Sequence, residues 1–262
     1  MSHPQNSRFS QYLHRRWIAY AGLFVGLALT ALSTYFLKSK VDDNAQLTFV
    51  AECNEIKLNI GARLESCAQI LMAGAALFNA SVSVEREEWR AFTKGLRLEN
   101  QLSGIQGVGY ALIVPPRGLE QHIKEIRNQG FPDYDIRPSG QREVYTSIIY
   151  IEPFSDRNLR AFGYDMYSEP LRRAAMDRAC QENSCALSRK IVLVQETGKE
   201  VQAGTLMYMP IYRKGLPITN TAERQAAIMG WVYSPYRMTD LINGVAKKIR
   251  ILWPLIFSMA TA

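Results

Sequence analysis

Asp165 is the residue of this sequence best placed to do chemistry. It lies between Tyr164 and Met166 in the stretch FGYDMYSEPLRRAAMDRA, residues 162–179, just ahead of an expected helix. A carboxylate there could act as a general acid or base, hold a ligand, or cap the helix. Burying it among aromatic and sulfur side chains without a partner would be costly, so we expect it to have one. Two kinds of partner stay open: a donor group of a ligand at the mouth of an apolar pocket, or an arginine inside the protein. The internal candidates are Arg160, Arg172 and Arg173.

The capping role fits Ser168 better than Asp165. Ser168 directly precedes Glu169 and Pro170, which both suit a first helical turn. The helix is expected over about residues 169–182, with one buried stripe and one exposed face. The expected stripe is Leu171, Ala175 and Ala179, and the expected exposed face is Arg172, Arg173, Asp177 and Arg178.

Other residues give catalysis little support. Two of the three histidines precede an apolar span near the N-terminus, and His122 lies in a polar stretch of an expected helix, where we expect solvent exposure. This argues against Ser-His-Asp or Cys-His catalysis. The sequence also lacks a phosphate-binding glycine loop and any kinase or cyclase signature. We therefore expect no catalytic activity and no cofactor in the chain as it stands. Glycoside hydrolysis needs two carboxylates at a defined distance, and the sequence does not determine the distance between any two candidates. The candidates are Glu152, Asp156, Asp165 and Glu196.

The cysteines allow one local disulfide. Cys180 and Cys185 could close a small loop across QENS. Cys53 and Cys67 lie fourteen residues apart in a helical pattern, hence about 21 Å apart, too far for a bond within one straight helix. They could pair across a dimer or stay free, and all four could simply be small buried side chains. No histidine or third cysteine lies near Cys180, so we expect no zinc or other metal site.

An uncharged apolar run, WIAYAGLFVGLALTALSTYFL, covers residues 17–37. Its length spans a hydrocarbon core of about 30 Å and exceeds the apolar region of a cleaved signal peptide, the alternative considered. Arginines in the preceding tail, residues 1–16, predict that this tail is cytoplasmic. We therefore expect a single-pass protein of the inner (cytoplasmic) membrane, with the bulk of the chain in the periplasm or outside the cell.

Residues 38–80 continue the helix as a stalk. An apolar stripe repeats along it at intervals of four and three residues, the heptad spacing of a helix that packs on a partner helix. The stripe could form a homodimer interface, or it could lie on the chain's own domain, and so short a run leaves both open. Its members are Ile60, Leu64, Cys67, Leu71, Gly74 and Phe78.

After the stalk, residues 81–245 change to an alternating pattern typical of strands. Ser83 could cap a helix beginning at Val84, and a further helix is expected over about residues 118–129. The last three strands leave no room for long connecting helices, so we expect an antiparallel meander and an α+β fold. The five expected strands are residues 104–114, 142–153, 187–196, 204–213 and 227–237.

The C-terminal tail and the net charge give further information about the class of protein. The apolar tail at residues 246–262 contains Pro254 and is too short for a second crossing. Either the receptor is truncated, which we expect, or the tail packs on the surface. The net charge is +7, but three of the 31 Lys and Arg precede the apolar run, which leaves 28 against 24 Asp and Glu. That balance does not indicate a nucleic-acid partner.

Several of these segments, taken in order, resemble the CHASE domain, the extracellular sensory module of membrane-bound histidine kinases, diguanylate cyclases and plant cytokinin receptors. The similarity covers roughly residues 81–241. Its segments are GIQGVGY, YTSIIYIEPFSDRN, AFGYDMYSEPLRRAAMDRA, LSRKIVLVQE, LMYMPIY and GWVYSPYRM.

The resemblance implies a long stalk helix, dimerisation along it, and two PAS-like halves with a small ligand in the half far from the membrane. In the cytokinin receptors, the aspartate that matches Asp165 hydrogen-bonds the ligand, so the resemblance favours the ligand over the internal arginine. The walls it implies here are Leu193, Met207 and Met209, with Tyr164 and Tyr233 as additions. Met209 and Trp231 are bulkier than expected on the assumed pocket side, which argues against a cytokinin-like purine.

The resemblance therefore implies a sensor in signal transduction, such as a two-component system, that binds a small molecule. One alternative is the input half of a diguanylate cyclase or sensor histidine kinase whose catalytic module is missing. Another is a protein that acts only by pairing with full-length receptors through residues 41–80.

Overall fold

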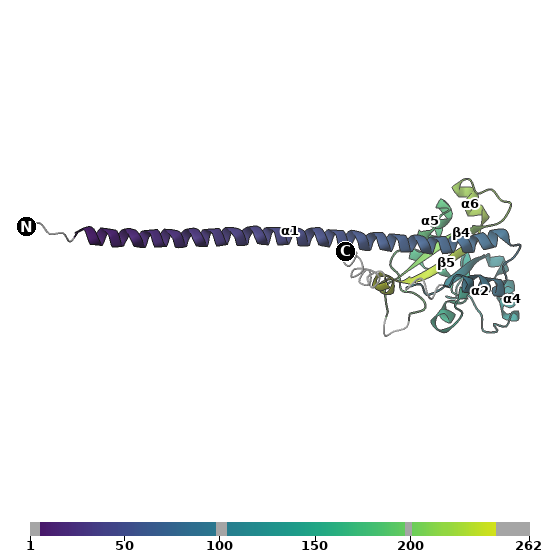
Figure 1. The fold of residues 1–262 in the computed structure, drawn as a ribbon. Coiled ribbons are helices and arrows are strands. Elements are labelled where there is room, and N and C mark those ends of the chain that lie inside the picture. The colour runs from purple at the N-terminus through teal and green to yellow at the C-terminus, as the bar shows by residue number, and fades with distance from the viewer. Residues whose placement is uncertain (1–5, 98–103, 197–200, 245–262) are drawn as a thin grey trace, which may run out of the picture. The chain divides into compact units, whose positions relative to one another are not determined.

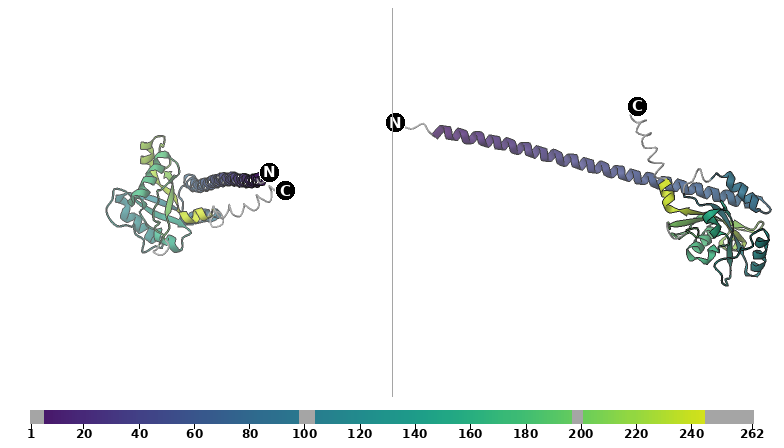
Figure 2. Two further views of the ribbon diagram at one scale, coloured as in Figure 1. Left: turned by 90° about the vertical axis from the view of Figure 1, so that its left-hand side faces the viewer. Right: turned by 90° about the horizontal axis from the view of Figure 1, so that it is seen from below.

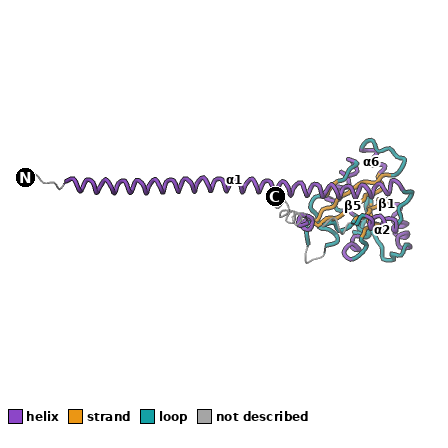
Figure 3. Tube along the Cα trace, viewed as in Figure 1, coloured by secondary structure: helices purple, strands orange, loops and turns teal. Residues whose placement is uncertain are grey.

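The computed structural model describes residues 6–97, 104–196 and 201–244, with side chains from residue 20 onward and at Trp17. The chain forms two compact units, Met1–Lys57 and Leu58–Ala262. Helix α1 (Asn6–Ala80) is one uninterrupted α-helix, as expected for the anchor and the stalk (Figure 3). It is long and apolar enough, by length and composition, to cross a membrane. The expected tail at residues 246–262 lies outside the described residues.

The second unit contains a five-stranded antiparallel sheet in the order β2-β1-β5-β4-β3. This confirms the α+β class. Figure 1 labels strands β4 and β5 of this sheet. The described residues hold this single sheet, whereas the resemblance implied two PAS-like halves. The strands are β1 (Val108–Val114), β2 (Tyr145–Glu152), β3 (Ala186–Leu187), β4 (Gly204–Tyr212) and β5 (Ile228–Arg237).

Four of the five expected strands are confirmed, but the strand expected over 187–196 is wrong, because β3 ends at Leu187. The Ser188 side chain ends the ladder: its Oγ accepts a hydrogen bond from the Leu206 amide at 3.0 Å. Beyond it, an isolated bridge joins Ile191 to Gly204. The rest of the segment runs as an irregular chain along the domain.

Short helices surround the sheet: α2 (Arg86–Gly95), α4 (Leu119–Asn128), α5 (Pro170–Glu182), α6 (Thr221–Ala227), and the 3-10 turns η1 (Pro116–Gly118), η2 (Asp156–Ala161) and η3 (Met166–Ser168). Helix α4 confirms the expectation for residues 118–129. Ser83 is not the cap of α2, since Glu85 occupies the N-cap and forms a capping box with Glu88.

Two apolar clusters lie on the two faces of the sheet. From Leu64 to Phe78, the stripe of α1 packs on one face, and Figure 2 shows this part of the helix running alongside the strands. A Cβ on Gly74 would come within 3.1 Å of Val232 Cγ1, so this glycine permits the close approach of α1 to β5. Along this length the stripe therefore belongs to the core of its own domain. Helix α5 packs on the opposite face with Ala175, Met176 and Ala179.

The cysteines are free in the structure. Cys180 belongs to the cluster under α5, whereas Cys185 packs against the cluster under α1. The two thiols therefore face opposite sides of the sheet, and the disulfide considered across QENS does not form. Cys185 Sγ lies instead 3.7 Å from Met209 Sδ.

The exposure expected for His122 is wrong. Its ring is buried and hydrogen-bonds the Tyr134 hydroxyl at 2.8 Å. Burial lowers the pKa of His122. Tyr134 also bonds Ser147 of β2, so His122 is one member of a buried polar chain that joins α4 to the sheet.

Candidate ligand-binding pocket

Asp165 is fully buried, and its carboxylate binds groups from several neighbouring segments. Its Oδ1 accepts hydrogen bonds from the Thr146 amide (3.0 Å), the Thr146 hydroxyl (2.8 Å) and the Tyr167 amide (3.1 Å). Its Oδ2 lies 3.5 Å from Arg142 Nη1. The carboxylate thus ties the start of strand β2 to η3, which it caps. The charge has an internal partner, but that partner is Arg142 and none of the three arginines proposed from the sequence.

Those three arginines bind main-chain carbonyls instead. Arg160 donates to Gln195 O at 2.8 Å, Arg172 to Val192 O at 2.9 Å and Arg173 to Tyr167 O at 2.7 Å. Two of these carbonyls belong to residues 188–196, here called the wall segment. Side-chain donors therefore hold the wall segment in place of the strand pairing that the sequence predicted.

The start of α5 also differs from the prediction. The cap is Glu169, whose carboxylate accepts from the amides of Leu171 and Arg172. Ser168 donates its hydroxyl to the Asp165 carbonyl and does not cap α5. Two of the expected helix positions are wrong: Arg172 is only 3% exposed, whereas Leu171 is 38% exposed. The others hold in part, since Ala175 and Ala179 are buried and Arg173 and Arg178 are exposed.

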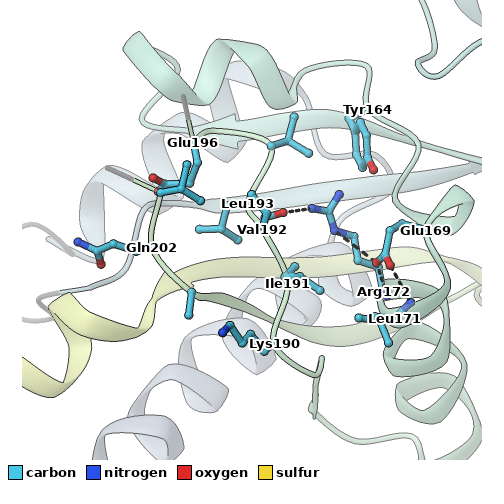
Figure 4. Close-up of a pocket in the computed structure, with 13 residues that line it drawn as sticks. Tyr164, Glu169, Leu171, Arg172, Lys190, Ile191, Val192, Leu193, Glu196 and Gln202 are labelled. Atoms are coloured by element: carbon cyan, nitrogen blue, oxygen red, sulfur yellow. Dashed lines mark hydrogen bonds and ion pairs between the residues drawn. The ribbon is translucent and has the colours of Figure 1, made fainter. Parts of the chain in front are cut away.

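A cavity of about 800 Å³ lies between the start of α5, the wall segment and the start of β4 (Figure 4). This volume falls in the range of small-molecule sites. Three of its apolar side chains, Leu171, Val192 and Val201, are exposed at it. The remaining described lining residues are Tyr164, Glu169, Arg172, Lys190, Ile191, Leu193, Val194, Glu196, Gln202 and Ala203.

Arg172 is the central polar group of this cavity. Its guanidinium carbon lies 4.8 Å from the centroid of the Tyr164 ring, and Nε lies 4.0 Å from Glu169 Oε2. In Figure 4 it reaches from α5 toward the wall segment, where it meets Val192. The side chain therefore fixes two walls of the cavity to each other.

The other charges differ in how they are paired. Glu196 is 4% exposed at its side chain and lies 2.9 Å from Arg237 Nε and 4.0 Å from Arg157 Nη1. Lys190 is exposed and forms no ion pair within the described ranges. With Glu169 matched by Arg172, the unpaired charge at this cavity is positive.

The structure brings together two of the six residues expected at a ligand site, Tyr164 and Leu193. Asp165 is adjacent in sequence but does not line the cavity. Met207 and Met209 lie on the opposite face of the sheet, toward α1. Tyr233 is on the α5 side but fully buried in the core.

On that α5 side, the sheet presents Tyr208, Trp231 and Tyr233. Trp231 donates its indole N–H to the Met176 carbonyl at 3.1 Å. Burial raises the pKa of both Tyr208 and Tyr233 far above the ordinary tyrosine value. The two hydroxyls are therefore neutral, and large aromatic rings fill the middle of this face.

Arg172 and Glu169 line the cavity but were not among the site residues predicted from the sequence. The available signal was the order Glu-Pro before the helix: proline favours the first helical position, which makes the preceding glutamate the cap. Within the described residues, no group of three or more His, Cys, Asp or Glu side chains could hold a metal ion.

Comparison with known proteins agrees with this architecture. Residues 82–255 match the CHASE domain family. No curated protein matches the chain. The CHASE domain is an extracellular sensory domain of signalling receptors rather than a catalytic one, and the apolar helix near the N-terminus fits a single-pass anchor. The chain, with its α1 helix and five-stranded sheet, belongs to the CHASE domain family.

Proposed function

We propose that this chain is the ligand-sensing part of a membrane receptor and binds a small-molecule signal in the cavity between α5 and the wall segment. Its N-terminus lies in the cytoplasm and its sheet domain lies outside the cytoplasmic membrane. The observation that carries the proposal is the cavity of about 800 Å³ lined by a buried arginine and exposed apolar side chains. Ligand sites typically combine apolar walls with a few placed polar groups.

The direct contacts we propose are Tyr164, Arg172 and Leu193. Tyr164 and Leu193 supply aromatic and aliphatic surface, and Arg172 supplies N–H donors. Asp165 then acts as a positioning residue, because it fixes η3 and so the start of α5 through Thr146 and Tyr167.

Ligand occupancy could reach α1 through strand β4. Leu206 and Tyr208 face α5, whereas Met207 between them faces α1. A ligand that favours one arrangement of α5 and the wall segment would shift the packing of this strand. The shift is limited by the difference in ligand affinity between the two arrangements.

Thermal unfolding of the full chain in lipid nanodiscs, screened against a panel of small metabolites, tests the site. A true ligand raises Tm by mass action. The rise should shrink in Tyr164→Leu and Arg172→Met and persist in the control Arg189→Met, which changes an exposed arginine outside the cavity. A hit whose effect is unchanged in both cavity variants would sink the proposed site.

Asp165 remains the second candidate for ligand contact. Its Oδ2 is buried and accepts no hydrogen bond within the described part of the chain, so a ligand donor could pair with it. This version predicts that the same hit is lost in Asp165→Asn and kept in Tyr164→Leu. The opposite pattern favours the cavity beside the wall segment.

Dimerisation through α1 is a further element of the proposal. Because the stripe from Leu64 to Phe78 packs on the domain itself, a homodimer would use the α1 surface outside it. Cys53 is exposed on α1 and reports on such pairing. Oxidation should give a crosslinked dimer that Cys53→Ser abolishes, whereas a purely monomeric product would count against pairing near Cys53.

The output of the receptor would be a kinase or cyclase module on the cytoplasmic side, with this chain as its input half. Reading the gene beyond codon 262 tests this. A sequence encoding such a module there would support it. The absence of one would favour a receptor that signals through partner proteins.

A further inference from the structure

A second cavity, of about 420 Å³, lies at the other end of the sheet domain, where α1 ends and the chain turns toward α2. It shares no lining residue with the cavity beside the wall segment. Its volume also suits a small molecule. The residues that line it are Phe78, Val82, Ser83, Val84, Tyr110, Ile149, Tyr150, Tyr212, Arg213, Lys214 and Met229.

Four aromatic rings line this second cavity. The rings of Phe78 and Tyr110 lie 4.3 Å apart at their centroids, and those of Tyr110 and Tyr150 lie 6.1 Å apart. Gly230 makes room for Tyr110, since a Cβ there would lie 2.9 Å from Tyr110 Cε2. Together with Tyr212, these rings give a planar apolar ligand faces and edges to pack against.

The charged side chains that line the second cavity are both positive. Arg213 and Lys214 are exposed and form no ion pair within the described ranges, and no aspartate or glutamate lines the cavity. Lys214 Nζ donates to the Ser81 carbonyl, which uses one of its three protons. Arg213 Nη1 makes one long contact, 3.5 Å, with the Ala226 carbonyl. Both cations therefore keep donors for an anion.

One polar group in the aromatic wall is also without a partner. The Tyr110 hydroxyl is buried and makes no hydrogen bond among the described residues. Leaving such a group unsatisfied costs stability. A ligand oxygen that reached it would remove that cost.

We propose that this second cavity binds a small aromatic carboxylate, with its ring among Phe78, Tyr110 and Tyr150 and its carboxylate at Arg213 and Lys214. Aromatic packing and two unopposed cations select a ligand that is both planar and anionic. A ligand in this site contacts the last turn of α1 together with strands β1 and β2, and so adds to the packing that holds α1 on the sheet. This inference does not depend on the proposed signal site.

The test is calorimetric titration of the full chain in nanodiscs with 3-phenylpropionate, with empty nanodiscs as the blank. We expect saturable binding, weaker by about tenfold or more for 3-phenylpropanol, which has the same ring without the charge. Arg213→Gln/Lys214→Gln should weaken 3-phenylpropionate binding by about tenfold or more, and Arg213→Lys/Lys214→Arg should largely retain it. Lys190→Gln, at the cavity beside the wall segment, should have no effect.

Each contrary result overturns the inference. Absence of saturable binding up to about 10 mM excludes the site as a functional one. Equal binding of 3-phenylpropanol and 3-phenylpropionate would show that the site has no preference for an anion. A loss in Lys190→Gln with none in the Arg213/Lys214 double variant assigns the anion to the other cavity. Because the charge-retaining double variant changes the same positions, it separates lost recognition from lost folding.

Discussion

Replacing Leu71 by alanine tests whether the apolar stripe of α1 is part of its own domain's core. Leu71 has no exposed surface and packs in the cluster beneath α1. Truncating a fully buried leucine lowers the free energy of unfolding by about 2–5 kcal/mol. For a domain of this size, each kcal/mol corresponds to about 2–4 °C, so we expect Tm to fall by about 4–20 °C.

The matched control is Leu47→Ala on the same helix, where the side chain is 69% exposed. Its effect should stay within about 0.5 kcal/mol. The Leu71→Ala and Leu47→Ala variants are both measured by thermal unfolding of the full chain in detergent, at low and high protein concentration. The loss at Leu71 should be the same at both concentrations, because the contact is within one chain. A loss no larger than that of the control would show that Leu71 is not part of the core, and a loss that disappears at high concentration would show that the stripe is a dimer interface.

Further predictions concern buried polar groups and the thiols. Asp165→Ala should cost about 3–5 kcal/mol in denaturant unfolding, because it leaves Arg142 and the Thr146 donors without their carboxylate; a cost below about 0.5 kcal/mol would show that Asp165 is not structural. Burial lowers the pKa of His122, so the unfolded state binds the proton first, and stability should fall as pH drops below about 6.5; an identical pH slope in His122→Gln would contradict this. Alkylation and mass analysis of the unfolded, unreduced protein should find both Cys180 and Cys185 modified. A disulfide joining the peptides that contain them would refute their placement on opposite faces of the sheet.

Much of the fold follows from residue periodicity. The uncharged run and the absence of proline after it predict one long helix, and α1 is that helix. The alternating, β-branched segments predict β1, β2, β4 and β5. These features are local, so the sequence carries them without knowledge of tertiary contacts.

The face of a strand is harder to predict than the strand itself. Met207 and Met209 were expected at the ligand side, but Leu206 and Tyr208 occupy that side. Alternate residues of a strand point to opposite faces, so the two sets differ by a single position. Because β4 is apolar on both faces, its pattern does not say which face meets α5.

The wall segment could not be predicted from its own residues. The run LSRKIVLVQE has the composition of a strand, yet side chains from elsewhere bind its carbonyls: Arg172 at Val192 and Arg160 at Gln195. Such side-chain contacts are long-range and leave no periodic signal. The same contacts bury Arg172, which the helical pattern alone assigned to solvent.

The most direct test of the proposed signal site is a structure of the full chain with a ligand that raises its Tm. We expect ligand density between α5 and the wall segment, in contact with Tyr164, Leu193 and the Arg172 guanidinium. Ligand density elsewhere, with this cavity empty and its walls unchanged, would refute the proposed site.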